Sequence, residues 1–168
     1  MGLFMMQLKK SLCMIGLVVC PGFCLALNEG AAAPRFSLPV FDQAVIRESS
    51  EYLGKVIYLD FWASWCGPCQ VSVPQLIQLQ ADLNSDEFEV VAINVDEEAH
   101  RARRFLASYN VNYTVLADPT GQVAAEYELM GMPSAFIVNQ EGKIVKIHTG
   151  FKLGDMDIIR SHINELLN

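Results

Sequence analysis

The sequence predicts an α/β domain built around a mixed β-sheet. Apolar runs typical of buried strands alternate with segments of helical periodicity, which is the pattern of repeated β-α-β units. After these units come two strand-like segments joined by a short turn, and a final amphipathic segment closes the chain. Because a hairpin adds antiparallel pairing to a parallel sheet, we expect the sheet to be mixed.

The individual elements follow from the spacing of apolar residues. Residues 55–63 are almost continuously apolar, which predicts a central strand covered on both faces. Pro39 indicates an edge position for the first extended segment, and Pro74 should kink the first long helix. The expected strands are residues 36–45, 55–63, 88–95, 113–117, 134–138 and 143–148. The expected helices are residues 49–53, 68–83, 97–109, 123–129 and 155–167, the last with Ile158, Ile159, Ile163, Leu166 and Leu167 facing inward.

The N-terminal segment 1–26 has the layout of a secretory signal peptide. Lys9 and Lys10 form a positive region, an apolar stretch follows, and Cys24 and Ala26 are small residues suited to cleavage. An uncleaved membrane anchor is the alternative, because the uncharged run of about 18 residues is at the lower limit for spanning a bilayer. Residues 27–33 would then be a spacer, and residues 34–168 a single domain.

Removing the signal peptide leaves Cys66 and Cys69 as the only cysteines and changes the net charge from −7 to −9. An acidic domain has no electrostatic basis for binding nucleic acid, so we expect no such partner. His100, His148 and His162 have no spacing that suggests metal ligands, and we interpret them as ordinary surface or half-buried residues. No nicotinamide-binding pattern is visible either, and we expect neither a metal nor a cofactor.

The segment Trp65-Cys66-Gly67-Pro68-Cys69 lies where the central strand should pass into the first long helix. Two cysteines at this spacing can form and reopen a disulfide, because a helix N-terminus favours a thiolate. Lowering a thiol pKa from ~8.5 to ~7 requires about 2 kcal/mol, and a helix terminus supplies ~0.3–1, or up to ~2 in favourable geometry. The pattern indicates a redox site, in which an exposed Cys66 attacks a partner disulfide and Cys69 resolves the mixed disulfide.

Further motifs carry a family resemblance. Residues 60–69, with Pro74 downstream and Gly131-Met132-Pro133-Ser134 before the hairpin, resemble thioredoxin-fold proteins. Three further features are similar to TlpA/ResA/CcmG-like thiol–disulfide oxidoreductases, relatives of the AhpC/TSA redoxins. They are residues 33–38, residues 90–96, and the helix and strand that precede residues 118–121. The resemblance covers about residues 34–168. It implies a thioredoxin-like fold, with a central mixed β-sheet flanked by helices, an extra helix-strand insertion and an N-terminal extension.

The resemblance also implies roles for single residues. Asp60 matches a buried carboxyl group that exchanges a proton with Cys69 during resolution, and a polar strand residue satisfied by its neighbours is the alternative. Pro133 matches a cis-proline that faces the cysteine pair. Ser72 departs from the pattern, because many relatives have a glutamate there, so an acid role at that position cannot be transferred.

The same resemblance indicates where a protein substrate would dock. Met132, next to the cis-proline, would pair its backbone with an incoming peptide, and Trp65 would shield the attacking sulfur and contribute to docking. Gly67 and Pro68, between the cysteines, complete the expected substrate-binding set. Their dipeptide is the one found in thioredoxins, which favours disulfide reduction over oxidation.

The expected function is therefore a periplasmic or secreted protein-disulfide reductase, held at the inner membrane if the leader is not cleaved. Its partners would be proteins that contain disulfides, with apocytochrome c among them, and a membrane-embedded thiol reductant of the DsbD/CcdA type. We expect a monomer. A peroxiredoxin-like peroxidase is one alternative, although Ala63 stands where those enzymes usually have threonine. A Cu(I) metallochaperone is the other, although copper-delivery relatives use a wider cysteine spacing.

Overall fold

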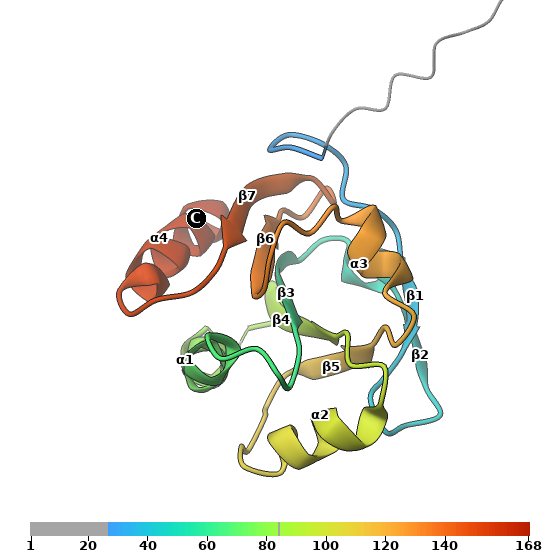
Figure 1. Ribbon diagram of the computed structural model, residues 1–168. Helices are drawn as coiled ribbons and strands as arrows, with labels where there is room; N and C mark the ends of the chain where they lie inside the picture. The colour runs from blue at the N-terminus through green and yellow to red at the C-terminus, as the bar shows by residue number, and fades with distance from the viewer. Residues whose placement is uncertain (1–26, 84) are drawn as a thin grey trace, which may run out of the picture.

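A five-stranded β-sheet forms the centre of the computed structural model, which describes residues 27–83 and 85–168 (Figure 1). The strand order is β5-β4-β3-β6-β7, with β3, β4 and β5 parallel and β6 antiparallel to both β3 and β7. The strands are β3 (Val56–Trp62), β4 (Phe88–Asn94), β5 (Thr114–Ala117), β6 (Ser134–Val138) and β7 (Ile144–Thr149). The predicted mixed sheet is confirmed, whereas the predicted signal peptide lies outside the described residues.

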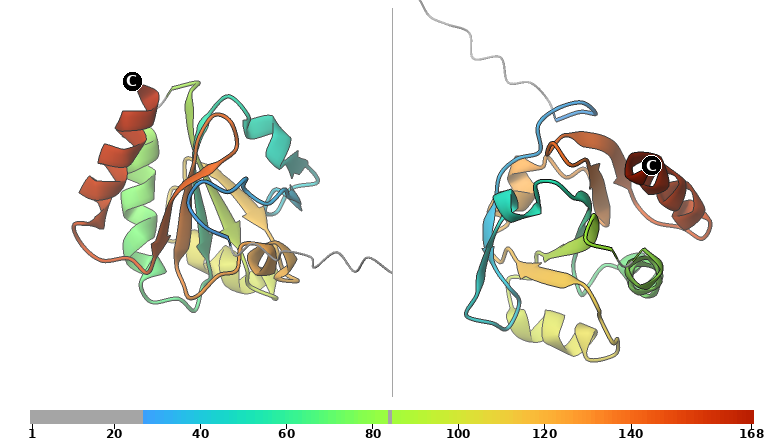
Figure 2. Two further views of the ribbon diagram at one scale, coloured as in Figure 1. Left: turned by 90° about the horizontal axis from the view of Figure 1, so that it is seen from above. Right: turned by 180° about the vertical axis from the view of Figure 1, so that it is seen from behind.

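Helices and a small hairpin cover the two faces of this sheet (Figure 2). On one face, α1 (Cys69–Asp82) and α4 (Asp155–Leu167) lie side by side and are joined by an ion pair between Arg160 and Asp82 at 2.8 Å. Helix α2 (Ala99–Leu106) belongs to the same face, because Ala102 packs with Trp62. The other face is covered by the β1–β2 hairpin (Ser37–Pro39 and Ile46–Glu48), the 3-10 helix η1 (Ser49–Tyr52) and α3 (Gln122–Glu126). Within the described part of the chain, no helix is both long and apolar enough to cross a membrane.

Strand β3 is the centre of the core. All of its residues are buried, as the apolar run predicts, and alternate side chains point to opposite faces. Tyr58 packs against α1 and α4 on one face, while Leu59 and Phe61 pack on the other in a cluster with Tyr127 and Phe136. Because β4 and β6 flank β3 on both sides, its carboxyl end reaches the middle of the sheet edge. The segment that follows β3 therefore starts from the middle of a buried sheet.

The predicted extended segment over residues 36–45 is wrong in its second half. The chain is extended only in β1 and then reverses in a tight turn, in which the N–H group of Val40 donates to the carbonyl oxygen of Val45 at 2.7 Å. Asp42 takes a left-handed conformation in this turn, with φ +57°. The turn was missed because Asp42 is the one turn-favouring residue between Val40 and Val45, in a segment that is otherwise mostly apolar. Residues 46–48 then pair antiparallel with β1 as β2.

The implied helix-strand insertion is present as α2 and β5. Strand β5 extends the sheet beyond β4, and Phe41 partly covers its outer edge by donating its N–H group to the carbonyl oxygen of Val115 at 2.8 Å. The other predicted elements are also present, although α2 and α3 are shorter than predicted. The insertion places α2 beside the segment that links β3 to α1, since Ala102 belongs to the same buried cluster as Cys66 and Cys69.

The predicted inward face of α4 is wrong at one residue. Ile158 is 55% exposed, whereas Ile159 and Ile163 are buried together with Met156. The spacing of three and four residues between the buried side chains is that of one helical face, and Ile158 falls outside it. The error arose because Ile158 and Ile159 are adjacent and equally apolar, so the sequence does not say which of them faces the sheet.

This pair of neighbours provides a stability test. Ile159→Ala should lower the free energy of unfolding by about 2–5 kcal/mol, because it removes buried methyl groups and leaves a cavity. Ile158→Ala makes the same chemical change on an exposed side chain and should cost no more than about 0.5 kcal/mol. Urea unfolding of the two variants measures both values. Equal losses would mean that α4 packs on a different face.

Candidate functional site

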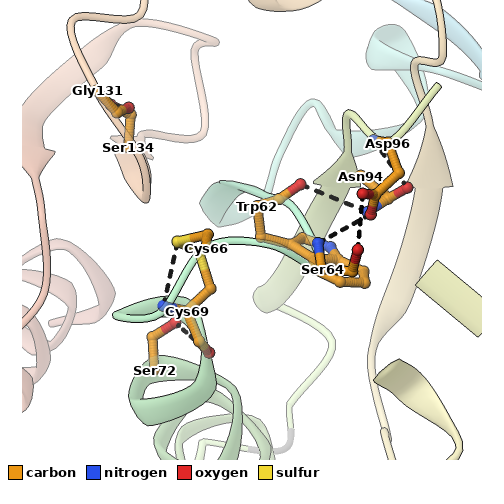
Figure 3. The surroundings of a disulfide bond; sticks show 9 residues. All are labelled: Trp62, Ser64, Cys66, Cys69, Ser72, Asn94, Asp96, Gly131 and Ser134. Carbon is orange, nitrogen blue, oxygen red and sulfur yellow. Dashed lines mark hydrogen bonds between the residues drawn. A yellow bond between two sulfur atoms is a disulfide. The ribbon is translucent and has the colours of Figure 1, made fainter. Parts of the chain in front are cut away.

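The two predicted redox cysteines lie where β3 leaves the sheet and α1 begins (Figure 3). Cys66 and Cys69 form a disulfide with an S–S distance of 2.06 Å and a Cα–Cα distance of 5.3 Å. Helix α1 begins at Cys69, directly after Pro68, whose fixed φ of −61° suits the start of a helix. The pair therefore lies beyond the carboxyl end of a central strand, where open α/β sheets commonly place their sites.

The backbone of α1 points at one of the two sulfurs. The N–H group of Cys69 donates to Sγ of Cys66 at 3.2 Å. This N–H belongs to the first turn of the helix and has no carbonyl partner within it, so it is free to stabilise negative charge. When the disulfide opens, Cys66 is the sulfur that this N–H group can hold as a thiolate.

Both cysteines are more buried than predicted for the attacking residue. Cys66 is 3% exposed and Cys69 is 0% exposed, so Cys66 is the outer sulfur but is not openly accessible. Neighbouring side chains account for this burial, because Cys66 and Cys69 pack in one cluster with Trp62, Ala63 and Ala102. Little of the Cys66 side chain is therefore open to a partner protein in the oxidised form.

The residues predicted to meet a substrate form the outer surface of this loop. Trp65 is 64% exposed, and Gly67 and Pro68 are exposed as well. A Cβ atom added at Gly67 would meet nothing within 4 Å, so the space beside Gly67 is open. Trp62, by contrast, is buried and packs on Phe105 with ring centroids 5.0 Å apart, as a core residue should.

The loop before β6 adjoins the cysteines. The peptide bond between Met132 and Pro133 is cis, and the Met132 side chain packs against the cluster that contains Cys66 and Cys69. Ser134 closes the loop by donating its hydroxyl to the carbonyl oxygen of Gly131 at 2.8 Å (Figure 3). The structure thus brings the Met132-Pro133 pair to the redox site.

Asp60 lies in the middle of β3, between the small residues Ala92 and Ala135 of the neighbouring strands. Strand alternation places it on the same face as Tyr58 and Trp62, the face that α1 covers. Asp60 is 2% exposed, and its Oδ2 has no hydrogen-bond partner among the described residues. Burial raises the pKa of its carboxyl group to about 8. Neighbouring side chains and backbone groups among the described residues therefore leave Oδ2 unsatisfied.

Ser72 is the position where many relatives have a glutamate. Its side chain is buried, and its hydroxyl donates to the carbonyl oxygen of Cys69 at 3.2 Å. The hydroxyl is therefore bound to the backbone of its own helix. A neutral group stands here, and the only acid that the sequence predicts beneath the cysteines is Asp60.

Sequence reasoning missed a polar cluster on the other side of the loop. Asp96 accepts two hydrogen bonds from Ser64, one from its N–H group at 2.9 Å and one from its hydroxyl at 2.8 Å (Figure 3). Asn94 donates its side-chain N–H to the same carboxylate at 2.8 Å. Polar residues that directly follow a buried strand were the available signal, although nothing in the sequence links them to Ser64.

The histidines were interpreted as unrelated surface or half-buried residues. His100 is exposed, while His148 and His162 are half-buried with ring centroids 6.2 Å apart. Burial, followed by the neighbouring His162, lowers the pKa of His148. Among residues 27–83 and 85–168, no group of three or more His, Cys, Asp and Glu side chains is arranged to hold a metal ion.

Comparisons with known proteins agree with this site. The Redoxin family model matches residues 28–161. The chain is 37% identical over 125 residues to the thiol-disulfide oxidoreductase ResA of Bacillus subtilis (strain 168), covering 74% of this chain and 69% of that protein. Among solved structures, a putative thiol:disulfide interchange protein DsbE from Chlorobium tepidum is 39% identical with a TM-score of 0.81, covering 84% and 99% of the two chains. The exposed lipoprotein thioredoxin Etrx1 of Streptococcus pneumoniae strain TIGR4 is 29% identical with a TM-score of 0.68, covering 79% and 100%.

The buried carboxyl group predicts a pH-dependent stability difference. In the folded protein Asp60 keeps its proton up to a pKa of about 8, whereas in the unfolded chain it loses the proton near 3.8. Between these pH values folding takes up a proton, so the contribution of Asp60 to stability falls as the pH rises. Asp60→Asn removes this penalty and should raise the free energy of unfolding of the oxidised protein at pH 7 by up to about 4 kcal/mol. Urea titrations should show the gain shrinking toward pH 4, and parallel pH profiles would contradict the raised pKa.

Proposed function

Because the chain belongs to the Redoxin family, and within it to the ResA-type thiol–disulfide oxidoreductases, we propose that it reduces disulfides in proteins outside the cytoplasm. The observation that carries the proposal is the hydrogen bond from the Cys69 N–H group to Sγ of Cys66 at the start of α1. It distinguishes the two sulfurs and gives each a different part in thiol–disulfide exchange.

The reaction begins with the reduced enzyme. The Cys66 thiolate attacks one sulfur of the substrate disulfide, and the other substrate sulfur leaves as a thiolate. The resulting mixed disulfide is then attacked by Cys69, which lies deeper and is reached only by an intramolecular partner. The substrate leaves with two thiols, and the enzyme is left with the Cys66–Cys69 disulfide.

Asp60 assists the second attack. Cys69 must lose its proton to become a nucleophile, and the ionised fraction of Asp60 can accept it, because an acid with a pKa of about 8 is matched to a thiol near its ordinary value of ~8.5. A carboxylate of ordinary pKa would be too weak a base at neutral pH. Burial of Asp60 among Ala92 and Ala135 supplies this match.

Substrate docking uses the exposed surface around the pair. Trp65, Gly67 and Pro68 offer an uncovered surface, and the backbone beside the Met132–Pro133 bond pairs with an extended segment of the substrate. Proteins with accessible disulfides are the substrate class. Oxidised apocytochrome c belongs to this class, because its haem-attachment motif contains two cysteines at the same short spacing.

The direction and location of the reaction rest on further observations. The thioredoxin-like Gly67-Pro68 dipeptide favours reduction, and a membrane-embedded thiol reductant of the DsbD/CcdA type would return two electrons and two protons to the disulfide. The predicted signal peptide over residues 1–26, the spacer 27–33 and the domain 34–168 fit export, and the pneumococcal relative is described as an exposed lipoprotein. None of the relatives reported above is named as a peroxidase or copper carrier, and we do not propose those activities.

Trapping experiments test the roles of the two sulfurs. In Cys69→Ala, the mixed disulfide cannot be resolved, so Cys66 should remain covalently bound to its substrates when the variant is expressed in the native host. The adducts should appear on non-reducing gels, disappear with dithiothreitol and be identifiable by mass spectrometry. Cys66→Ala is the matched control and should trap nothing. Adducts that depend on Cys69 instead would reverse the assignment.

The direction of the reaction is tested by the reduction potential. We expect a value nearer to that of thioredoxin, about −270 mV, than to that of the strong oxidant DsbA, about −120 mV. Equilibration with glutathione buffers of defined ratio measures it. The wild-type enzyme should also reduce insulin with dithiothreitol as donor, and Cys66→Ser should abolish this turnover. A potential close to −120 mV would overturn the reductase assignment.

A further inference from the structure

Asp96 lies just beyond β4, beside the segment that leads from β3 to Cys66 (Figure 3). It is 3% exposed, and the structure gives its carboxylate no cationic partner among the described residues. Both carboxylate oxygens instead contact one residue. Oδ2 accepts the N–H group of Ser64 at 2.9 Å, and Oδ1 accepts the hydroxyl of Ser64 at 2.8 Å. A buried carboxylate is thus used to hold a single residue of the redox loop.

The carboxylate is itself held in place by Asn94, which is 1% exposed. The Asn94 side chain donates to Oδ2 of Asp96 at 2.8 Å and accepts the N–H group of Asp96 at 3.2 Å. One residue further along, the N–H group of Val95 donates to the carbonyl oxygen of Trp62 at 3.0 Å. The chain on both sides of Ala63 is therefore bound to the end of β4.

This attachment reaches almost to the reacting sulfur. The N–H group of Cys66 donates to the carbonyl oxygen of Ala63 at 3.1 Å, closing a turn over residues 63–66. Trp65 is the one residue between Ser64 and Cys66, and it is 64% exposed. The backbone position of Cys66 consequently depends on where Ser64 is held. On the other side of the pair, Cys69 is fixed by α1.

We propose that Asp96 is a positioning residue for the redox reaction, which acts through Ser64 to keep Cys66 within reach of Cys69. The proposal deepens the proposed function, on which it rests for its biological meaning. In the oxidised enzyme the S–S bond itself holds the loop. In the reduced enzyme that bond is absent, and the Asp96–Ser64 contacts restrain Cys66. Loss of these contacts should therefore give the reduced form more conformational freedom than the oxidised form.

The affected equilibrium is the exchange with glutathione. The enzyme disulfide and two glutathione thiols give the enzyme dithiol and glutathione disulfide, so two electrons pass from the glutathione sulfurs to Cys66 and Cys69, and each enzyme sulfur gains a proton. Because loss of the Asp96 contacts favours the reduced enzyme, it should shift this equilibrium toward the dithiol. The enzyme would become easier to reduce and a weaker reductant.

Asp96→Ala, Asp96→Asn and a matched control test this proposal. In Asp96→Ala the equilibrium constant should shift toward the dithiol about tenfold, equivalent to about 30 mV for a two-electron couple. Asp96→Asn should stay within about twofold of wild type, because an amide oxygen can accept the Ser64 N–H and an amide NH₂ can donate to the Ser64 hydroxyl. Thiol alkylation after equilibration in glutathione buffers measures the constant.

Asp118→Ala is the control for loss of a buried carboxylate. Asp118 is 1% exposed, and its carboxylate accepts hydrogen bonds from Thr120, Gln122 and Ala124 near the start of α3 and none from residues 63–66; its N–H group, which the variant keeps, donates to the carbonyl oxygen of Asn94. This variant should lower the thermal midpoint as Asp96→Ala does, yet leave the equilibrium constant unchanged. An unchanged constant in a folded Asp96→Ala variant, or an equal shift in Asp118→Ala, would overturn the proposal.

Ser64→Ala keeps the test decisive if Asp96→Ala does not fold. It removes only the hydroxyl contact and should shift the equilibrium constant in the same direction, by about threefold. A wild-type constant in Ser64→Ala would then count against the proposal. Failure of the proposed function would be seen separately, as a wild-type enzyme that exchanges with glutathione but does not reduce protein disulfides.

Discussion

The hydrogen bond from the Cys69 N–H group to the Cys66 sulfur is the interaction on which the redox site depends. It exists because β3 ends in the middle of the sheet edge and α1 begins only a few residues later. The short link leaves the N–H group of Cys69, the first residue of the helix, free to point at the place where Cys66 must lie. A longer link would give the sulfur more freedom, and a later helix start would remove the donor.

Around this bond, the structure separates a reactive interior from an exposed outer surface. The sulfurs are buried, whereas Trp65, Gly67 and Pro68 are exposed above them. Three segments distant in sequence support the pair, namely the end of β3, the residues that follow β4 and the loop before β6. The loop surface is thus free for contact with a partner, while the sulfurs stay packed against the core.

One residue near the redox site, Asp60, lowers the stability of the folded protein at neutral pH. Asp60 places an acid without a partner at Oδ2 in a fully buried strand, and burial raises its pKa to about 8. A neutral residue would fold more stably there at neutral pH. The small side chains of Ala92 and Ala135 on either side leave the acid room without giving it a hydrogen bond. The proton exchange with Cys69 that we propose for this acid would account for a less stabilising residue at the centre of the sheet.

The sequence alone determined the redox pair, the helix and strand that hold it, and the acid in the central strand, because each depends on spacing within a short segment. It did not determine the hairpin over residues 37–48, the choice between Ile158 and Ile159 on α4, or the approach of His148 to His162. It also gave no sign that Asp96 binds Ser64, 32 residues earlier. These features arise when strand pairing and helix packing bring distant residues together. Tertiary structure decided them. For Asp96 and Ser64 the deciding feature is the register of β3 with β4, which no local pattern encodes and which sets which side chains meet beyond the ends of these strands.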